Sequence, residues 1–101
     1  MAIGIKPSQI LMALWDETID CVHENGGEDA WLFGSVARHE DTVESDIDLA
    51  VQFRPGIGLF AVAGMKLALQ DLLGTKVDLV DIDALRPERD DEIIADLVGS
   101  I

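Results

Sequence analysis

The chain has 101 residues, of which 49% are hydrophobic, so we expect one packed domain over residues 1–101 and not a disordered segment. Its 20 acidic and 7 basic residues give a net charge of −13, which argues against binding to nucleic acid or to an anionic membrane surface. This balance favours a basic protein partner or a metal–phosphate complex, and the high apolar fraction is compatible with an oligomer or hetero-complex. The single cysteine, Cys21, excludes an internal disulfide, and no leader or transmembrane run is evident, so we expect a cytoplasmic location.

The first half of the chain predicts one helix and one short strand. Pro7 and Ser8 are typical of a helix start, and Gly26 and Gly27 of a helix end. Between them, apolar residues at three-and-four spacing predict an amphipathic helix: Ile10, Leu11, Leu14, Trp15, Ile19 and Val22. The apolar run 30–33 predicts a strand that ends at Gly34, and 35–44 predict a polar connection that starts with one helical turn.

The second half predicts two strands and two helices. Residues 46–53 alternate between apolar and polar, which is typical of a half-buried strand, and the break at 54–56 ends it. Residues 59–73 predict a helix that Gly74 ends, and 76–80 predict a third strand. Pro87 is expected to open a last helix whose apolar stripe is Ile93, Ile94, Leu97 and Val98. This order predicts a small α/β (α+β) domain, a short mixed sheet with helices packed on one face.

Three carboxylates stand out within this pattern. Asp46 and Asp48 share one face of their strand, roughly 6.5 Å apart along the chain. Carboxylates at such spacing repel unless a cation lies between them, and magnesium is the usual cation. Asp78 lies on the third strand, which follows a helical crossover and is expected beside the second. The three together suit a two-metal site, in which Asp78 holds the catalytic metal or takes the proton from the attacking hydroxyl.

A glycine–serine pair precedes these carboxylates in the chain. Gly34 lets the backbone approach a phosphate closely, and the Ser35 hydroxyl can donate a hydrogen bond to a phosphate oxygen. The sequence therefore predicts a site that handles nucleotides.

Three segments together resemble the signature of the minimal nucleotidyltransferases, the smallest members of the DNA polymerase β-like nucleotidyltransferase superfamily. They are Gly34-Ser35-Val36-Ala37-Arg38, Ser45-Asp46-Ile47-Asp48-Leu49 and Val77-Asp78-Leu79-Val80. The resemblance implies that family's fold and the transfer of a nucleoside monophosphate to a hydroxyl, with ATP as donor, two Mg²⁺ ions and pyrophosphate released. It implies that Asp46, Asp48 and Asp78 are the catalytic metal ligands, and that Gly34, Ser35, Arg38 and Ser45 contact the nucleotide.

The resemblance also implies a partner. Many minimal nucleotidyltransferases are antitoxins paired with a helical HEPN-class toxin, and some add AMP to a tyrosine of that toxin. At this length no residues remain for the second helical domain of larger relatives, so we expect a partner protein to complete the acceptor site. One position departs from the family, which usually has glycine where this chain has His39.

Other interpretations stay open from the residues alone. The chain could be a catalytically inactive antitoxin or complex subunit that neutralises its partner by binding alone. An enzyme acting on a small hydroxyl compound, such as an aminoglycoside, is disfavoured by the short chain, and a nucleic-acid polymerase by the charge. Arg38 could pair with Glu40 or Glu44 instead of a phosphate, and Asp78 could be an ordinary exposed strand residue.

Overall fold

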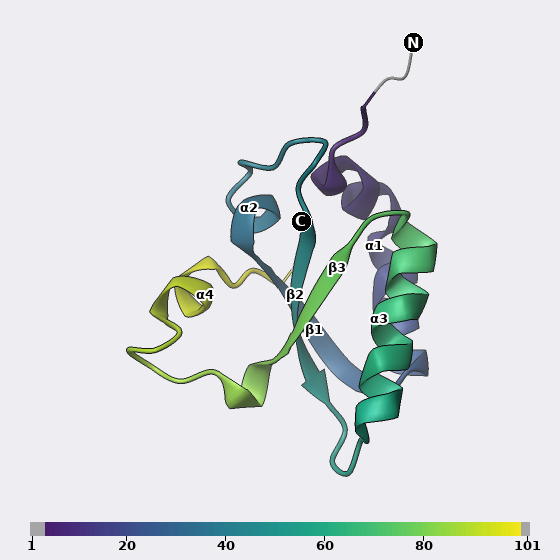
Figure 1. Cartoon of the computed structure of the whole chain (residues 1–101), viewed down its shortest axis with the longest axis vertical. Coiled ribbons are helices and arrows are strands. Elements are labelled where there is room, and N and C mark those ends of the chain that lie inside the picture. Colours follow the sequence, from purple (N-terminus) through teal and green to yellow (C-terminus); the bar gives the residue numbers. More distant parts are fainter. Residues whose placement is uncertain (1–3, 100–101) are drawn as a thin grey trace.

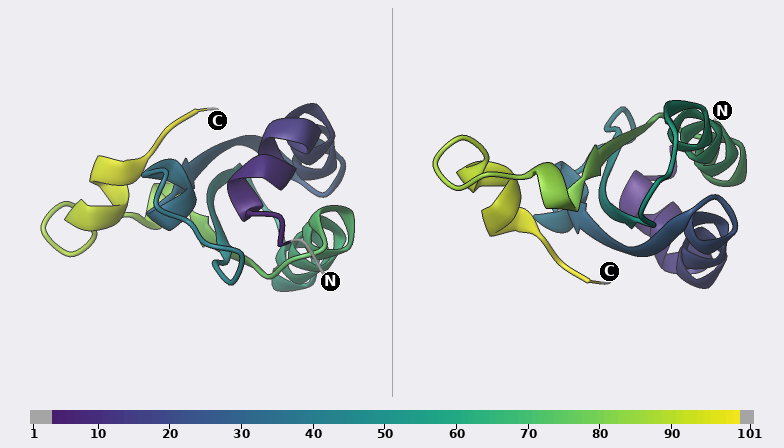
Figure 2. Two further views of the ribbon diagram at one scale, coloured as in Figure 1. Left: turned by 90° about the horizontal axis from the view of Figure 1, so that it is seen from above. Right: turned by 90° about the horizontal axis from the view of Figure 1, so that it is seen from below.

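The computed structural model of the protein describes residues 4–99, and it contains a three-stranded sheet with helices on both sides. The long helices α1 (Pro7–Glu24) and α3 (Leu59–Leu73) lie next to each other on one face of the sheet (Figure 1). The short helices α2 (Gly34–Ala37) and α4 (Asp91–Asp96) lie on the other side, as both views of Figure 2 show. The predicted fold class, a small mixed sheet with helices packed on one face, is confirmed by the two long helices, and the short helices are added on the other side.

The sheet has the strand order β1–β2–β3, with β2 (Ile47–Phe53) at its centre. β1 (Gly27–Phe33) pairs with β2 antiparallel, and β3 (Val77–Asp81) pairs with β2 parallel. A parallel neighbour requires a crossover connection, and α3 supplies it between β2 and β3. The strand pairing expected between the second and third strands is therefore observed.

The core lies between the sheet and the two long helices. Every second residue of β2, namely Ile47, Leu49 and Val51, is fully buried there, as the alternation predicted. α3 contributes Met65, Leu69 and Leu73 from one face. Because these side chains fix β2 by its inner face, the carboxylate of Asp48 projects from the opposite face.

The start of α1 is held by a residue far away in the chain. Asp41, in the loop between α2 and β2, is buried and accepts a hydrogen bond from the Ser8 backbone N–H at 2.8 Å. Burial raises the pKa of this carboxyl, but the hydrogen bonds from Ser8 outweigh that effect, and the pKa lies below its ordinary value. Asp41 therefore satisfies one of the free N–H groups of the first helical turn.

The last helix differs from the prediction at both ends. It begins at Asp91 and not at Pro87, because Glu88 has φ +73° and the Asp90 and Asp91 carboxylates accept backbone N–H bonds from the preceding turn. It ends at Asp96, because Val98 instead pairs with Leu32 of β1 through two backbone hydrogen bonds.

The boundaries of all three strands also differ, and the second begins at Ile47 and not at Asp46. The first strand begins at Gly27 and not at residue 30, since Gly27 and Asp29 pair with Phe53 and Gln52 at the end of β2, with a register shift between them. The third strand runs 77–81 where 76–80 was predicted, and a 3₁₀ turn, η1 (Ile82–Ala84), follows it unpredicted. Within residues 4–99, no helix has the length and apolar character needed to span a membrane.

Candidate active site

The three carboxylates named from the sequence lie at one end of the sheet. Asp48 of β2 pairs in register with Asp78 of β3 on one side and with Phe33 of β1 on the other. Asp46 comes two residues before Asp48, just outside the strand. Parallel neighbours lie about 4.8 Å apart, so Asp48 and Asp78 are adjacent on the same face of the sheet. The structure therefore places Asp48 and Asp78 side by side as predicted, with Asp46 two residues from Asp48 but outside the strand.

Gly34 packs directly against this group. It follows Phe33, the strand partner of Asp48, and has φ +73°, in the left-handed region that favours glycine. A Cβ at this position would lie 2.2 Å from Oδ2 of Asp48. Glycine is thus required here twice, by its backbone conformation and by the space that the Asp48 carboxylate occupies.

The pKa of the Asp48 carboxyl is shifted by burial and by the charged groups around it. Partial burial raises the pKa of its carboxyl above the ordinary value, and the carboxylates of Asp78 and Asp46 raise it further. Arg38 and Lys76 lower it in part. The excess negative charge makes this end of the sheet a place where a cation is stabilised.

Two lysines place positive charge beside these carboxylates. The Lys76 ammonium lies 3.7 Å from Oδ2 of Asp46, and the Lys66 ammonium lies 4.0 Å from Oδ1 of Asp78. Neither lysine was predicted from the sequence as part of the site. Lys76 could have been noticed because it lies two residues before Asp78, immediately before β3, whereas Lys66 approaches from α3 only through the tertiary fold.

The remaining candidate residues, Ser35, Ser45 and Arg38, differ in burial and in their hydrogen-bond partners. Ser35 is half-buried in α2, immediately after Gly34. The Ser45 hydroxyl accepts a hydrogen bond from the Thr42 backbone N–H at 2.9 Å, which stabilises the turn before Asp46. Arg38 donates to Glu40 at 3.1 Å and to Asp96 of α4, so the acidic pairing that was open from sequence is observed for Glu40.

His39 stands where the resemblance predicts a glycine, and its backbone conformation is one that favours glycine. It has φ +59°, a left-handed conformation that glycine adopts without strain. Histidine adopts this conformation at a cost in stability.

The residues fit a divalent metal in their chemistry. Carboxylate oxygens are the ligands that Mg²⁺ prefers, and the two ammonium groups already stand where positive charge balances Asp46 and Asp78. Over the described part of the chain, however, no three His, Cys, Asp or Glu side chains are gathered closely enough to hold an ion as they stand. A bound cation would have to replace the lysine contacts.

Comparison with known proteins identifies the protein family to which this chain belongs. The sequence model of the family described as "Polymerase beta, Nucleotidyltransferase" matches residues 19–98, which include all three carboxylates and the glycine–serine turn. The chain therefore belongs to the polymerase β nucleotidyltransferase family.

Individual relatives indicate which members of this family the chain is similar to. A protein of Methanocaldococcus jannaschii named "Putative protein adenylyltransferase MJ0435" is 35% identical over 75 residues, covering 74% of this chain and 81% of that protein. The solved "Structure of putative minimal nucleotidyltransferase" has a TM-score of 0.77 at 34% identity, over 90% of this chain and 93% of that one. "Crystal structure of the toxin-antitoxin with AMP-PNP" shares the fold, with a TM-score of 0.69 at 24% identity over 82% of this chain and 68% of that chain. The resemblance to minimal nucleotidyltransferases is thus confirmed.

Proposed function

We propose that this chain is a metal-dependent protein adenylyltransferase, which transfers AMP from ATP to a hydroxyl of a protein and acts as the antitoxin of a HEPN-class toxin. The observation that carries the proposal is the in-register pairing of Asp48 with Asp78, with Asp46 beside them and Gly34 packed on Asp48. The name of the M. jannaschii relative supports protein as the acceptor.

Each residue has a role in this proposal. Asp46, Asp48 and Asp78 would hold two Mg²⁺ ions, which neutralise phosphate charge and lower the pKa of the attacking hydroxyl. Asp78, which lies on the edge strand β3, would orient that hydroxyl and accept its proton. Lys66 and Lys76, released from the carboxylates, would balance the charge of the triphosphate, and Arg38 would do so if its contacts with Glu40 and Asp96 open.

A toxin partner has independent support. The solved toxin–antitoxin structures share this fold, and one of them was solved with AMP-PNP. The net charge of −13 suits a basic protein partner more than another acidic surface.

The test is label transfer from ATP labelled at the α-phosphate, with Mg²⁺ and the protein encoded by the adjacent gene. We expect label on that protein with the wild-type chain and none with Asp46→Asn. Asp83→Asn is the matched control, because Asp83 is an exposed acid on η1 outside the carboxylate group. Equal labelling by the wild type and Asp46→Asn would refute the proposed role of the carboxylates.

The alternative, neutralisation by binding alone, is favoured by one observation. Asp46 is paired with Lys76 and Asp78 with Lys66, so the carboxylates are not preassembled around an ion within the described residues. A stable complex that suppresses the partner's toxicity equally well with Asp46→Asn, and without label, would establish this alternative.

A further inference from the structure

The outer surface of α3 is apolar although nothing in the described part of the chain covers it. Phe60, Ala63, Gly64 and Leu67 follow the spacing that places residues on one helix face, opposite the buried Met65, Leu69 and Leu73. Phe60 is 95% exposed, Leu67 63%, and Leu59 at the helix start 88%. We call Leu59, Phe60, Ala63, Gly64 and Leu67 the outer face of α3.

The composition of α3 is that of a helix covered on two sides. Only Lys66 and Asp71 are charged among its 15 residues, and Asp71, four residues after Leu67, lies at the C-terminal end of the outer face. Apolar side chains occur on all other sides of the helix. Surface helices normally carry polar residues on the side away from the core, and helices that are apolar all round are buried. Because this face is exposed in the single chain, its composition indicates that a partner covers it.

Gly64 gives a second indication. It lies in the middle of the helix, and a Cβ at this position would meet no atom within 4 Å. Packing within the chain does not require glycine there, although glycine in a helix interior is destabilising relative to alanine. A partner that approaches the backbone of α3 closely would require it.

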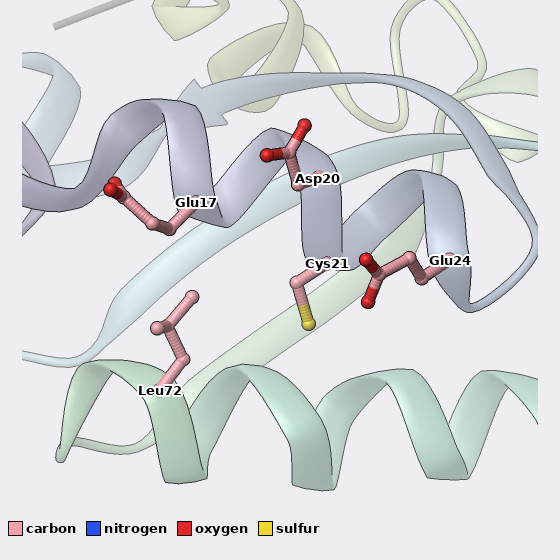
Figure 3. A pocket seen from close by; sticks show the side chains of 5 residues that line it. All are labelled: Glu17, Asp20, Cys21, Glu24 and Leu72. Atoms are coloured by element: carbon pink, nitrogen blue, oxygen red, sulfur yellow. The ribbon is translucent and has the colours of Figure 1, made fainter.

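The charges beside this face indicate what kind of partner fits. Glu17, Asp20 and Glu24 lie on one exposed face of α1 and, with Cys21 and Leu72, line a pocket between α1 and α3 (Figure 3). These carboxylates thus lie on the α1 side of α3, across from Leu72, and the exposed Asp71, four residues after Leu67, adds a carboxylate at the end of the outer face itself. A second copy of the chain would bring the same acidic row and another charge of −13, so like charges would oppose its docking.

We infer that the outer face of α3 is the docking surface for a different protein, one that presents apolar side chains bordered by lysine or arginine. This inference deepens the proposed function and rests on it for the partner's identity. A partner on this face would also lie beside Lys66, whose ammonium is 4.0 Å from Asp78, so docking would bring the partner's surface to the edge of the candidate active site.

The test measures binding to the protein of the adjacent gene by co-purification and titration calorimetry. We expect Phe60→Ser combined with Leu67→Ser to weaken binding at least tenfold, as truncated central anchors do at interfaces. Exchanging Glu17, Asp20 and Glu24 for the matching amides is expected to weaken binding and to reduce its salt dependence. Val43→Ser is the control, since Val43 is an exposed apolar residue in the loop before β2.

Gly64→Ala separates docking from folding. In the free chain it should raise the melting temperature by about 3–6 °C, because alanine favours the helix and the space is open. The same substitution should weaken the complex. Phe60→Ser should leave the melting temperature of the free chain unchanged, and a large drop would mean that the face already packs within the chain and would overturn the inference.

The remaining outcomes are distinguishable. A wild-type chain that dimerises by light scattering, and becomes monomeric with Phe60→Ser, would assign the face to a second copy and overturn the inference. No complex between the monomeric wild type and the adjacent protein would overturn it as well. Binding that depends on the face without label transfer would refute the proposed enzymatic function alone, and transfer that is unimpaired by the face variants would refute the docking surface alone.

Discussion

The substitution Gly34→Ala tests whether the site depends on a glycine packed against a carboxylate. Alanine at φ +73° costs about 1–2 kcal/mol of backbone strain. Its Cβ would also lie 2.2 Å from Oδ2 of Asp48, where ordinary contact begins at 3.4 Å, so the carboxylate must move by more than 1 Å. Shifting a packed group in this way costs about 1–2 kcal/mol more, so we expect Gly34→Ala to lower the free energy of unfolding by about 2–4 kcal/mol.

Two further variants separate these terms. Gly74, which follows α3, has φ +68°, and a Cβ added there would meet no atom within 4 Å, so Gly74→Ala should show the backbone strain of about 1–2 kcal/mol alone. In an Asp48→Ala background the carboxylate is gone, and Gly34→Ala should there cost no more than Gly74→Ala. The resulting double-mutant cycle should give a coupling of about 1–2 kcal/mol between positions 34 and 48.

Urea unfolding followed by tryptophan fluorescence at pH 7 measures each of these free energies, since Trp15 and Trp31 are both half-buried. Transfer activity of Gly34→Ala should fall by about 100-fold, the effect of a misplacement of roughly 1 Å. A cost for Gly34→Ala equal to that for Gly74→Ala, with no coupling to Asp48, would refute the proposed contact.

Four other measurements test the electrostatics, the backbone and the metal. Asp48→Asn should raise the free energy of unfolding by about 0.5–1 kcal/mol at pH 7, a value reduced by solvent screening. Because the folded-state pKa of Asp48 is raised, the wild type loses stability as the pH rises through that pKa. The stability gained by the variant should therefore vanish below the ordinary pKa of 3.8. Asp41→Ala should lower stability by about 1 kcal/mol at pH 7 because the Ser8 N–H loses its acceptor, and since the folded-state pKa of Asp41 is lowered, urea midpoints of the two proteins should converge as pH falls through it. His39→Gly should stabilise the chain by about 0.5–1 kcal/mol, because the relief of left-handed strain exceeds the added entropy of the unfolded chain. An unchanged melting temperature would contradict the left-handed conformation at residue 39. Mg²⁺ with a non-hydrolysable ATP analogue at about 100 times its dissociation constant should stabilise the wild type by about 2.7 kcal/mol and Asp46→Asn much less, with equal melting shifts as the contrary result.

Local patterns determined a large part of the fold. The helix from Leu59 to Leu73 and the strand ending at Phe53 follow from apolar spacing and from glycine and proline at their ends, so their boundaries were predicted to within a residue. The same spacing placed Asp46 and Asp48 at the start of one strand. Asp78 could be assigned beside them because a helix between two strands favours a parallel neighbour.

Contacts between distant residues could not be predicted from such patterns. The start of the last helix was predicted wrongly for a local reason, since Asp90 and Asp91 accept N–H bonds from the preceding turn and Glu88 has a positive φ. The capping of α1 by Asp41 joins residues 33 positions apart, and the pairing of Arg38 with Asp96 joins residues 58 apart.

The candidate site divides in the same way. Its carboxylates could be named from the sequence, because Asp48 lies on the predicted strand and a helical crossover favours a parallel strand with Asp78 beside it, although β2 begins only after Asp46. Only the tertiary structure decided what surrounds them: Gly34 against Asp48, Lys66 from α3 beside Asp78, and Lys76 beside Asp46. Such contacts depend on how separate elements pack, and the periodicity within one element carries no information about its neighbours.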